Sequence, residues 1–248
     1  MLKRDSDRII ALIPAWNEAS TVGGIVQAAV LRLPVLVVDD GSTDGTAETA
    51  RRAGALVISH PTNRRKGAAL KTGFAWALAK GFDAVLTMDA DGQHHPDDID
   101  RLLAAYRDRR GDLIIGERDF SQMPWPNRYT TPLGSLLLSR ALDTRVTDNQ
   151  SGFRLLTRGL LESMRLSSDG YEMEVEMIWE AVRLGMSIAW VPIQTIYFRD
   201  RKSGFRPLMD TLLFLKMVLR IWRGRLSRNP RAREEICARA SMDQQESG

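Results

Sequence analysis

The sequence predicts an α/β fold with a doubly wound, mostly parallel sheet and helices on both faces. Short apolar runs alternate with helical patterns over the first half of the chain, as in parallel sheets that are buried on both faces. Polar and acidic residues follow several of these runs directly. Right-handed crossovers bring the loops after parallel strands to one edge of the sheet, where such folds bind ligands. At 248 residues the chain is long enough for one such domain with a sizeable core.

Each expected strand is a short apolar run bounded by turn residues. We expect strands at Ile9–Ile13, Val35–Val38, Leu56–Ile58, Ala84–Met88 and Leu113–Ile115, separated by helices at Thr21–Leu31, Asp44–Ala53, Gly67–Lys80 and Pro96–Arg107. In the second half we expect a helix at Leu133–Leu142, a strand at Phe153–Leu156, a helix at Glu172–Leu184, extended segments at Ile188–Val191 and Thr195–Phe198, and a helix at Leu208–Trp222.

The charge pattern divides the chain. Residues 1–198 have 23 basic and 25 acidic side chains, whereas residues 199–239 have 12 basic and 4 acidic ones, a local balance of +8. We therefore predict a folded domain at residues 1–206, an amphipathic helix at 207–226 and a disordered polar tail at 227–248. The basic helix suits an anionic membrane surface or a dimer interface, and its apolar content is too high for a nucleic-acid surface.

The composition also bears on location. No stretch of about 18 apolar residues exists, so we expect no helix that spans a bilayer. The first strand begins too early for a signal peptide, and the single cysteine, Cys237, excludes an internal disulfide. We expect a cytoplasmic protein that lies on the cytoplasmic face of the membrane.

The most informative stretch is Met88-Asp89-Ala90-Asp91-Gly92-Gln93-His94-His95-Pro96. Two carboxylates this close at a strand end repel each other unless a cation or a proton lies between them. Mg²⁺ prefers oxygen ligands and keeps waters and substrate phosphates as its other ligands. We predict that Asp89, Asp91 and Gln93 bind Mg²⁺ or Mn²⁺ beside a diphosphate. A helix-capping turn before Pro96 is the alternative explanation.

Three further loops suit a nucleotide. The first, Pro14-Ala15-Trp16-Asn17-Glu18, fits a ribose or a base, although a helix start explains it equally well. In the second, Asp39-Asp40-Gly41-Ser42-Thr43-Asp44-Gly45-Thr46, a capped turn explains the later residues but not the two acids. The third, Asn63-Arg64-Arg65-Lys66-Gly67-Ala68-Ala69, is not a Walker loop. Its Lys66 lies beside a helix N-terminus, which suits a diphosphate, although solvated basic residues are the simpler explanation.

Together these four loops resemble the motifs of the family 2 inverting glycosyltransferases. Within that family they are most similar to the dolichol-phosphate mannose synthase and polyprenyl-phosphate glycosyltransferase branch. The resemblance runs from about Ile9 to Phe205, with its motifs in family order. It implies the GT-A fold, a nucleotide-sugar donor and a divalent metal.

The second half carries further matches. Gly116-Glu117-Arg118 resembles a Gly-x-Arg motif whose arginine helps to hold phosphate, and Arg128 is placed like a basic residue for the acceptor phosphate. Asp148-Asn149-Gln150-Ser151-Gly152-Phe153-Arg154 is similar to the Asp-x-x-Ser-Gly-Phe-Arg signature of the family. Glu172 and Glu174 resemble an acidic helix. The segment 199–206 is similar to a basic donor-facing segment with altered spacing.

One further departure lies in the third loop, where Arg65 replaces a usual glycine. The resemblance and the loops together give two sets of site residues. The expected catalytic residues are Asp91, Arg118, Arg128 and Asp148. The expected donor-binding residues are Pro14, Ala15, Asn17, Glu18, Asp39, Asp40, Lys66, Gly67, Asp89, Ala90, Arg199 and Lys202.

The acceptor remains open between two classes. A hydroxyl acceptor requires a general base, for which Asp148 is the best candidate. A polyprenyl phosphate is already ionised and needs cations instead, which Arg118 and Arg128 supply. The apolar C-terminal helix favours the lipid, and a core or dimer helix is its alternative. A non-catalytic nucleotide-sugar or membrane-binding module is the third hypothesis, and Asp89, Asp91 and Lys66 argue against it.

Overall fold

The computed structural model describes residues 7–123, 127–170, 172–195, 214–219 and 221–222. The expected donor-binding residues Arg199 and Lys202 lie outside the described residues, as do most of the expected C-terminal helix and tail. Of the expected strand at Thr195–Phe198 only Thr195 is described, and it forms an isolated bridge with His94. Within the described part of the chain, no helix is long and apolar enough to cross a membrane.

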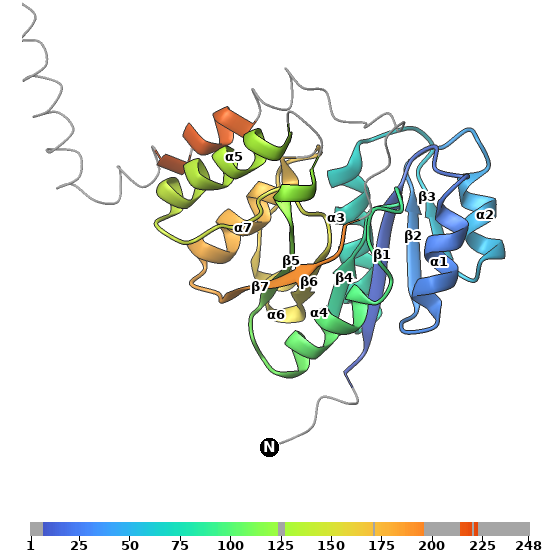
Figure 1. The fold of residues 1–248 in the computed structure, drawn as a ribbon. Coiled ribbons are helices and arrows are strands. Elements are labelled where there is room, and N and C mark those ends of the chain that lie inside the picture. Colours follow the sequence, from blue (N-terminus) through green and yellow to red (C-terminus); the bar gives the residue numbers. More distant parts are fainter. Residues whose placement is uncertain (1–6, 124–126, 171, 196–213, 220, 223–248) are drawn as a thin grey trace, which may run out of the picture.

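A seven-stranded sheet in the order β3-β2-β1-β4-β6-β5-β7 forms the centre of the molecule (Figure 1). Neighbouring strands are parallel except in the two pairs that include β6, which confirms the predicted mostly parallel sheet. The strands are β1 (Ile9–Ala15), β2 (Val35–Asp39), β3 (Leu56–Ser59), β4 (Ala84–Thr87), β5 (Leu113–Arg118), β6 (Arg154–Thr157) and β7 (Ile188–Ile193).

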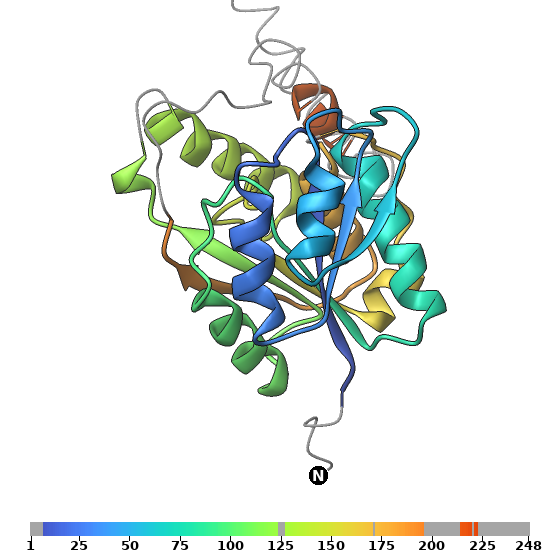
Figure 2. The ribbon, with the colours of Figure 1, turned by 90° about the vertical axis from the view of Figure 1, so that its right-hand side faces the viewer.

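Helices cover both faces of this sheet (Figure 2). They are α1 (Val22–Val30), α2 (Thr46–Arg52), α3 (Lys66–Ala79), α4 (Asp98–Arg107), α5 (Asn127–Leu142), α6 (Arg158–Ser163) and α7 (Met173–Arg183), with a 3₁₀ turn at Phe120–Gln122 and helical residues at 214–219. The expected start of α5 at Leu133 is wrong, because the helix continues N-terminally through Pro132. The helix α6 was not predicted, because its six residues are too few to show a helical period.

Two hydrophobic cores fill the two faces of the sheet. One contains apolar residues of α3, α6 and α7, and the other contains those of α1, α2 and α4. Alternate residues of β1 belong to different cores: Leu12 lies in the first and Ile13 in the second. Because central strands are buried on both faces, they appear in the sequence as continuous apolar runs. This packing places the carboxyl ends of β1, β2, β4 and β5 at one edge.

Candidate active site

Asp89 lies among buried charges just after β4. Lys66 Nζ is 2.6 Å from Asp89 Oδ1 and 2.6 Å from Glu174 Oε1 of α7. His94 Nε2 lies 3.4 Å from Asp89 Oδ2. Burial alone would raise the pKa of Asp89, but Lys66, assisted by His94, outweighs it and holds the pKa well below its usual range. The structure thus joins two predicted donor-binding residues, Lys66 and Asp89.

Asp91 is in a different electrostatic state from Asp89. Burial, followed by the nearby charge of Asp89, raises the pKa of Asp91. Its Oδ1 accepts a hydrogen bond from the backbone N–H of Gln93 at 3.0 Å. A divalent cation would offset the disfavoured charge of the ionised Asp91. Asp91 and Gln93 therefore fit a metal better than Asp89, whose oxygens face Lys66 and His94.

The donor set for such a metal is small. In the described ranges, no group of three or more Asp, Glu, His or Cys side chains gathers in a geometry that could hold a metal ion. Mg²⁺ is commonly held by one or two carboxylates together with waters and substrate phosphates. The predicted site at Asp91 and Gln93 therefore suits a metal that arrives with a diphosphate. It does not suit a metal held by protein side chains alone.

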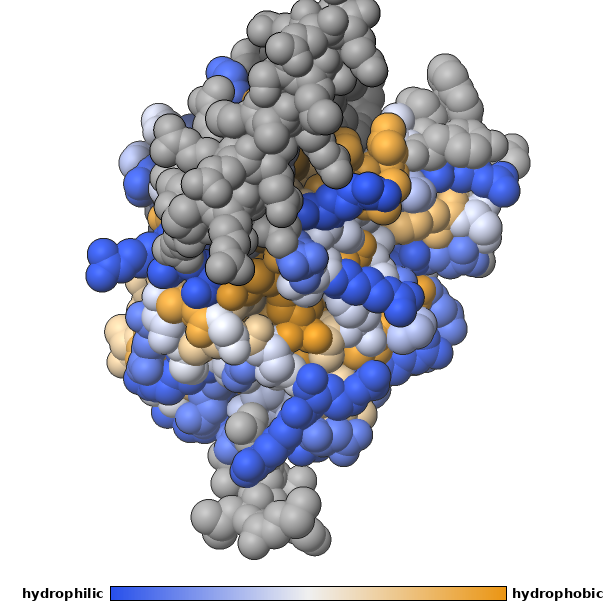
Figure 3. Space-filling model, turned by 90° about the vertical axis from the view of Figure 1, so that its left-hand side faces the viewer, coloured by the Kyte–Doolittle hydropathy of each residue, from blue (hydrophilic) through white to orange (hydrophobic). Residues whose placement is uncertain are grey.

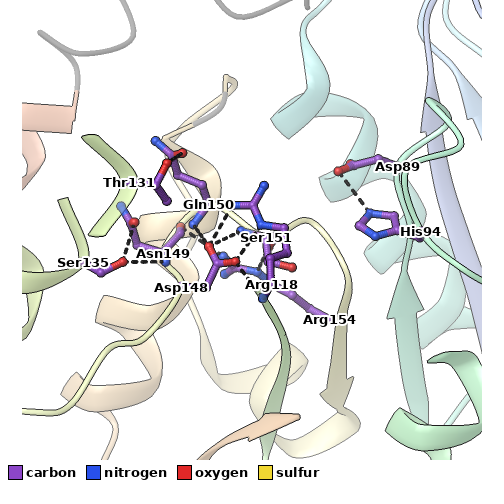
Figure 4. A network of polar contacts seen from close by, with 10 residues as sticks. All are labelled: Asp89, His94, Arg118, Thr131, Ser135, Asp148, Asn149, Gln150, Ser151 and Arg154. Carbon is purple, nitrogen blue, oxygen red and sulfur yellow. Dashed lines mark hydrogen bonds and ion pairs between the residues drawn. The ribbon is translucent and has the colours of Figure 1, made fainter. Parts of the chain in front are cut away.

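Arg118 and Asp148 form a bidentate ion pair (Figure 4). Arg118 Nε donates to Asp148 Oδ2 at 2.7 Å and Nη2 donates to Oδ1 at 2.8 Å. The backbone N–H groups of Gln150 and Ser151 also donate to Oδ1, each at 3.1 Å. Burial would raise the pKa of Asp148, but Arg118 outweighs it and lowers the pKa. A fully buried carboxylate with a lowered pKa is a poor general base.

Arg154 connects the two groups of charges. Its guanidinium is buried and donates to the carbonyl oxygens of Ser151 at 2.7 Å and Glu174 at 2.5 Å. Burial lowers the pKa of Arg154 to about 10, although the charges of Glu174, Asp148 and Asp89 oppose this shift. The signature motif therefore contributes a structural cation between the two carboxylate sites. The sequence alone did not indicate this contribution.

The helix α5 brings polar side chains to the Asp148 loop. Ser135 Oγ donates to Asn149 Oδ1 at 3.0 Å, and Thr131 Oγ1 lies 3.4 Å from Gln150 Oε1. Arg128 is exposed in the first turn of the same helix. The helix thus places Arg128 on an element that contacts the loop after Asp148.

The first loop (residues 14–18) and the second loop (residues 39–46) are joined by hydrogen bonds. The N–H of Asn17 donates to Ser42 Oγ at 2.8 Å, and Asn17 Oδ1 accepts from the N–H of Thr43 at 2.9 Å. The N–H of Glu18 donates to Thr46 Oγ1 at 2.8 Å. Asn17 therefore uses its amide oxygen to fix loop geometry, and this contact was not visible in the sequence.

Asp40 holds the third loop. It is buried, with Oδ1 2.6 Å from His60 Nδ1, and both carboxylate oxygens accept from the N–H of Arg64 at 3.0 Å. His60 Nε2 in turn lies 3.0 Å from Thr72 Oγ1 of α3. Asp39 instead accepts a hydrogen bond within its own loop, from the N–H of Ser42 to Oδ1 at 3.2 Å. Of the two predicted acids, Asp39 is the better candidate for direct donor contact.

Three predicted donor-binding residues have small or cyclic side chains in the core. Pro14 and Ala15 end β1 and are buried, and Ala90 is also buried. The carbonyl of Ala15 accepts from the N–H of Asp40 at 2.8 Å, and that of Ala90 accepts from Thr21 Oγ1 at 2.8 Å. These residues shape the edge of the sheet, and their side chains do not project from it.

A backbone carbonyl of the chain occupies an N–H group at the start of α3. The N–H of Gly67 donates to the carbonyl of Asp169 at 2.7 Å, so a donor diphosphate would meet Lys66 rather than this N–H. Arg65, which caps the helix, has φ 73° and ψ 160°, a conformation that strongly favours glycine. This backbone conformation explains why the family pattern has a glycine at the position of Arg65.

Replacement of Gly152 by alanine is expected to disturb the Asp89 site. An alanine Cβ would lie 2.6 Å from Asp89 Oδ1, and the contact of Lys66 with this carboxylate restricts its retreat. Overpacking of this kind costs about 1–3 kcal/mol. We expect a lower melting temperature and a raised KM for the donor. Gly159→Ala in α6 is the control, because its Cβ would meet nothing within 4 Å. Equal effects of both variants would contradict this prediction.

The family is decided by sequence comparison. Residues 10–165 match the model of a family described as Glycosyl transferase family 2. The chain belongs to glycosyl transferase family 2. This match confirms the resemblance inferred from the strand-end motifs.

Relatives in this family cover most of the chain. A polyprenol monophosphomannose synthase from Mycolicibacterium smegmatis is 33% identical over 81% of this chain and 81% of its own length. An undecaprenyl-phosphate mannosyltransferase from Micrococcus luteus is 35% identical over 79% of this chain and 86% of its own length.

A crystal structure supports the fold. Glucosyl-3-phosphoglycerate synthase from Mycobacterium tuberculosis, in complex with Mn²⁺, UDP and phosphoglyceric acid, has a TM-score of 0.70. It is 24% identical, and the match covers 91% of this chain and 80% of that one. The likeness confirms the predicted GT-A fold for this family 2 glycosyltransferase.

Proposed function

We propose that this chain transfers a sugar, with inversion, from a UDP- or GDP-sugar to a polyprenyl phosphate at the cytoplasmic surface of a membrane. The observation that carries this acceptor is the state of Asp148. As the candidate base it is buried, has a lowered pKa and is paired with Arg118. An ionised phosphate needs no base, and the names of the two family relatives support the same acceptor class.

The transfer is a single displacement at the anomeric carbon, in which one bond forms and one breaks. The acceptor phosphate oxygen forms a bond to this carbon as the bond to the donor diphosphate breaks on the opposite face, and no proton has to be removed. We assign Mg²⁺ or Mn²⁺ to Asp91 and Gln93, where a bound cation would offset the charge of the leaving diphosphate. The Mn²⁺ and UDP bound to the structural neighbour support the use of a divalent metal with a nucleoside diphosphate.

The chain supplies the other charges. Lys66 keeps its proton, because the two carboxylates beside it outweigh burial and raise its pKa. It therefore presents a fixed positive charge at the edge where the diphosphate binds. Arg118 is oriented by Asp148, and its planar guanidinium suits a phosphate. Arg128, exposed on α5, adds a second cation for the acceptor.

The direct test uses purified protein, a short-chain polyprenyl phosphate and a panel of UDP- and GDP-sugars with Mg²⁺ or Mn²⁺. We expect one donor to yield a glycolipid of the expected mass, and EDTA to stop its formation. A saccharide product with no glycolipid would refute the proposed acceptor. Donor turnover of either kind would exclude a non-catalytic binding module.

Asp148→Asn separates the two acceptor classes. With a phosphate acceptor we expect the variant to keep measurable turnover and a raised KM for the acceptor, because Asp148 acts by orienting Arg118. Loss of a general base would instead lower kcat by about 10²–10⁴-fold. The exposed neighbour Asp119, replaced by asparagine, is the control, and steady-state kinetics with a soluble acceptor is the measurement. A collapse of kcat at unchanged acceptor KM would favour a hydroxyl acceptor.

A further inference from the structure

The helix α5 packs Leu138 and Ala141 into the core, yet it also carries large apolar side chains on its outward face. Thr131 and Ser135 face inward and are buried, with 3% and 4% of their surface exposed, and they contact the loop after Asp148. The outward face carries three exposed leucines, Leu133 (56%), Leu136 (50%) and Leu137 (39%). A surface helix in water normally carries polar and charged side chains on its outward face.

The helical residues 214–219 extend this apolar surface. A Cβ on Gly134 of α5 would lie 3.5 Å from Phe214 Cζ, so the two elements are adjacent. Met217 and Ile221 are buried in the core. Three large neighbours remain about half exposed, namely Leu215 (41%), Leu219 (49%) and Trp222 (45%). We call the six residues Leu133, Leu136, Leu137, Leu215, Leu219 and Trp222 the leucine face.

The charges around the leucine face have one sign. Within the described residues 127–142, 214–219 and 221–222 no acidic side chain occurs. Arg128, Arg140 and Lys216 are all exposed there. The side of the molecule on which α5 and α7 lie shows hydrophobic patches between strongly hydrophilic ones (Figure 3). Apolar side chains bordered by basic ones suit the interface of an anionic bilayer.

We propose that the leucine face is the membrane-docking surface of this enzyme, with α5 as its main element. The occupant is an anionic lipid surface, because a second copy of the chain would bring the same basic side chains together. The inference rests on the proposed function for the acceptor. The inner face of α5 contacts the loop after Asp148, and Asp148 pairs with Arg118, so α5 lies between this loop and the lipid. The polyprenyl tail could then stay in the bilayer during transfer.

The test compares two sets of leucine substitutions in the full chain. Leu133→Ser/Leu136→Ser/Leu137→Ser removes the α5 part of the surface. Leu31→Ser/Leu56→Ser is the control, since these leucines are 81% and 52% exposed elsewhere. Binding to phosphatidylglycerol vesicles is measured by co-sedimentation, and turnover with a water-soluble short-chain polyprenyl phosphate is measured beside it.

We expect the wild type and the control variant to bind vesicles with affinities within about twofold of each other. We expect the triple variant to bind at least tenfold more weakly and to keep its turnover of the soluble acceptor. If the triple variant fails to fold, Arg140→Glu replaces it and should weaken binding to anionic but not neutral vesicles.

Two results would overturn the docking surface. One is equal vesicle binding by the wild type and the triple variant, or no binding by either. The other is a wild-type dimer, seen by light scattering, that the triple variant splits, because the leucine face would then be a subunit interface. Absence of turnover on the soluble acceptor by a wild type that binds vesicles would count against the proposed function alone.

Discussion

Asp91→Asn is expected to stop metal-dependent sugar transfer and to raise the melting temperature of the metal-free protein. Burial and the charge of Asp89 raise the pKa of Asp91, so its ionised form opposes folding at neutral pH. The neutral, isosteric amide removes this cost, and each kcal/mol relieved corresponds to roughly 2–4 °C at this chain length. Loss of charge stabilisation at the leaving group should lower kcat by at least about 100-fold.

The measurement is a pair of thermal scans, with and without Mg²⁺ and a nucleoside diphosphate, together with a glycolipid assay. The added ligands should stabilise the wild type and leave the variant unchanged. The gain in stability should shrink as pH falls through the raised pKa of Asp91, because the wild-type side chain then becomes neutral, as the asparagine of the variant is at every pH. Asp100→Asn, at an exposed ion pair with Arg32, is the control. Full activity of Asp91→Asn would exclude Asp91 as the metal ligand.

Lys66→Met is expected to give the largest loss of stability. Asp89 and Glu174 would lose the cation that lies 2.6 Å from each of them. Breaking a buried ion pair by removing one partner costs about 3–5 kcal/mol, because a charge is left uncompensated, and the partial exposure of Lys66 (17%) and Asp89 (26%) places the expected loss toward the lower end of this range. Chemical denaturation should show this difference directly. Donor turnover should also fall, since Lys66 is the predicted contact of the diphosphate.

The pH dependence gives this prediction a sign. Lys66 holds the pKa of Asp89 below its usual range, so the contact stabilises the wild type above the unfolded pKa of about 3.9. That contribution is lost as pH falls through the folded pKa. The gap between wild type and Lys66→Met should therefore be widest above about pH 4 and narrow only as pH falls below that value.

Lys71→Met is the matched control on the same helix. Lys71 pairs with Asp169 at 2.6 Å, but the side chains are 33% and 54% exposed. Such a pair contributes about 1 kcal/mol or less. A loss of stability in Lys71→Met equal to that in Lys66→Met would show that burial of the charges does not govern the effect.

The strands and helices of the first half were predictable because their signal is local. A strand buried on both faces is a continuous apolar run, and β1, β2 and β4 all have this pattern. The second half was predicted less well. A six-residue helix such as α6 is too short to repeat the helical period, and α5 contains a proline, a residue that local propensity does not favour inside a helix. The antiparallel direction of β6 depends on its partners and has no local signature.

The candidate site divides in the same way. Residue types at and near strand ends predicted Lys66, Asp89 and Asp91 as site residues, and the family resemblance implied Arg118 and Asp148. Their pairing could not be predicted, because Lys66 meets Glu174, and Arg118 meets Asp148, across long stretches of sequence. The contacts of Asn17 with Thr43 and of Asp40 with His60 could not be predicted for the same reason.

The sequence by itself determined the family and the mostly parallel sheet, and it predicted the sheet edge for the ligands, since apolar runs and strand-end motifs are local patterns. Only the tertiary structure decided the chemical state of each carboxylate. Asp89 is held ionised by Lys66, Asp148 is paired with Arg118, and Asp91 has a raised pKa. The physical reason is that a pKa depends on burial and on the charges nearby, and folding determines both.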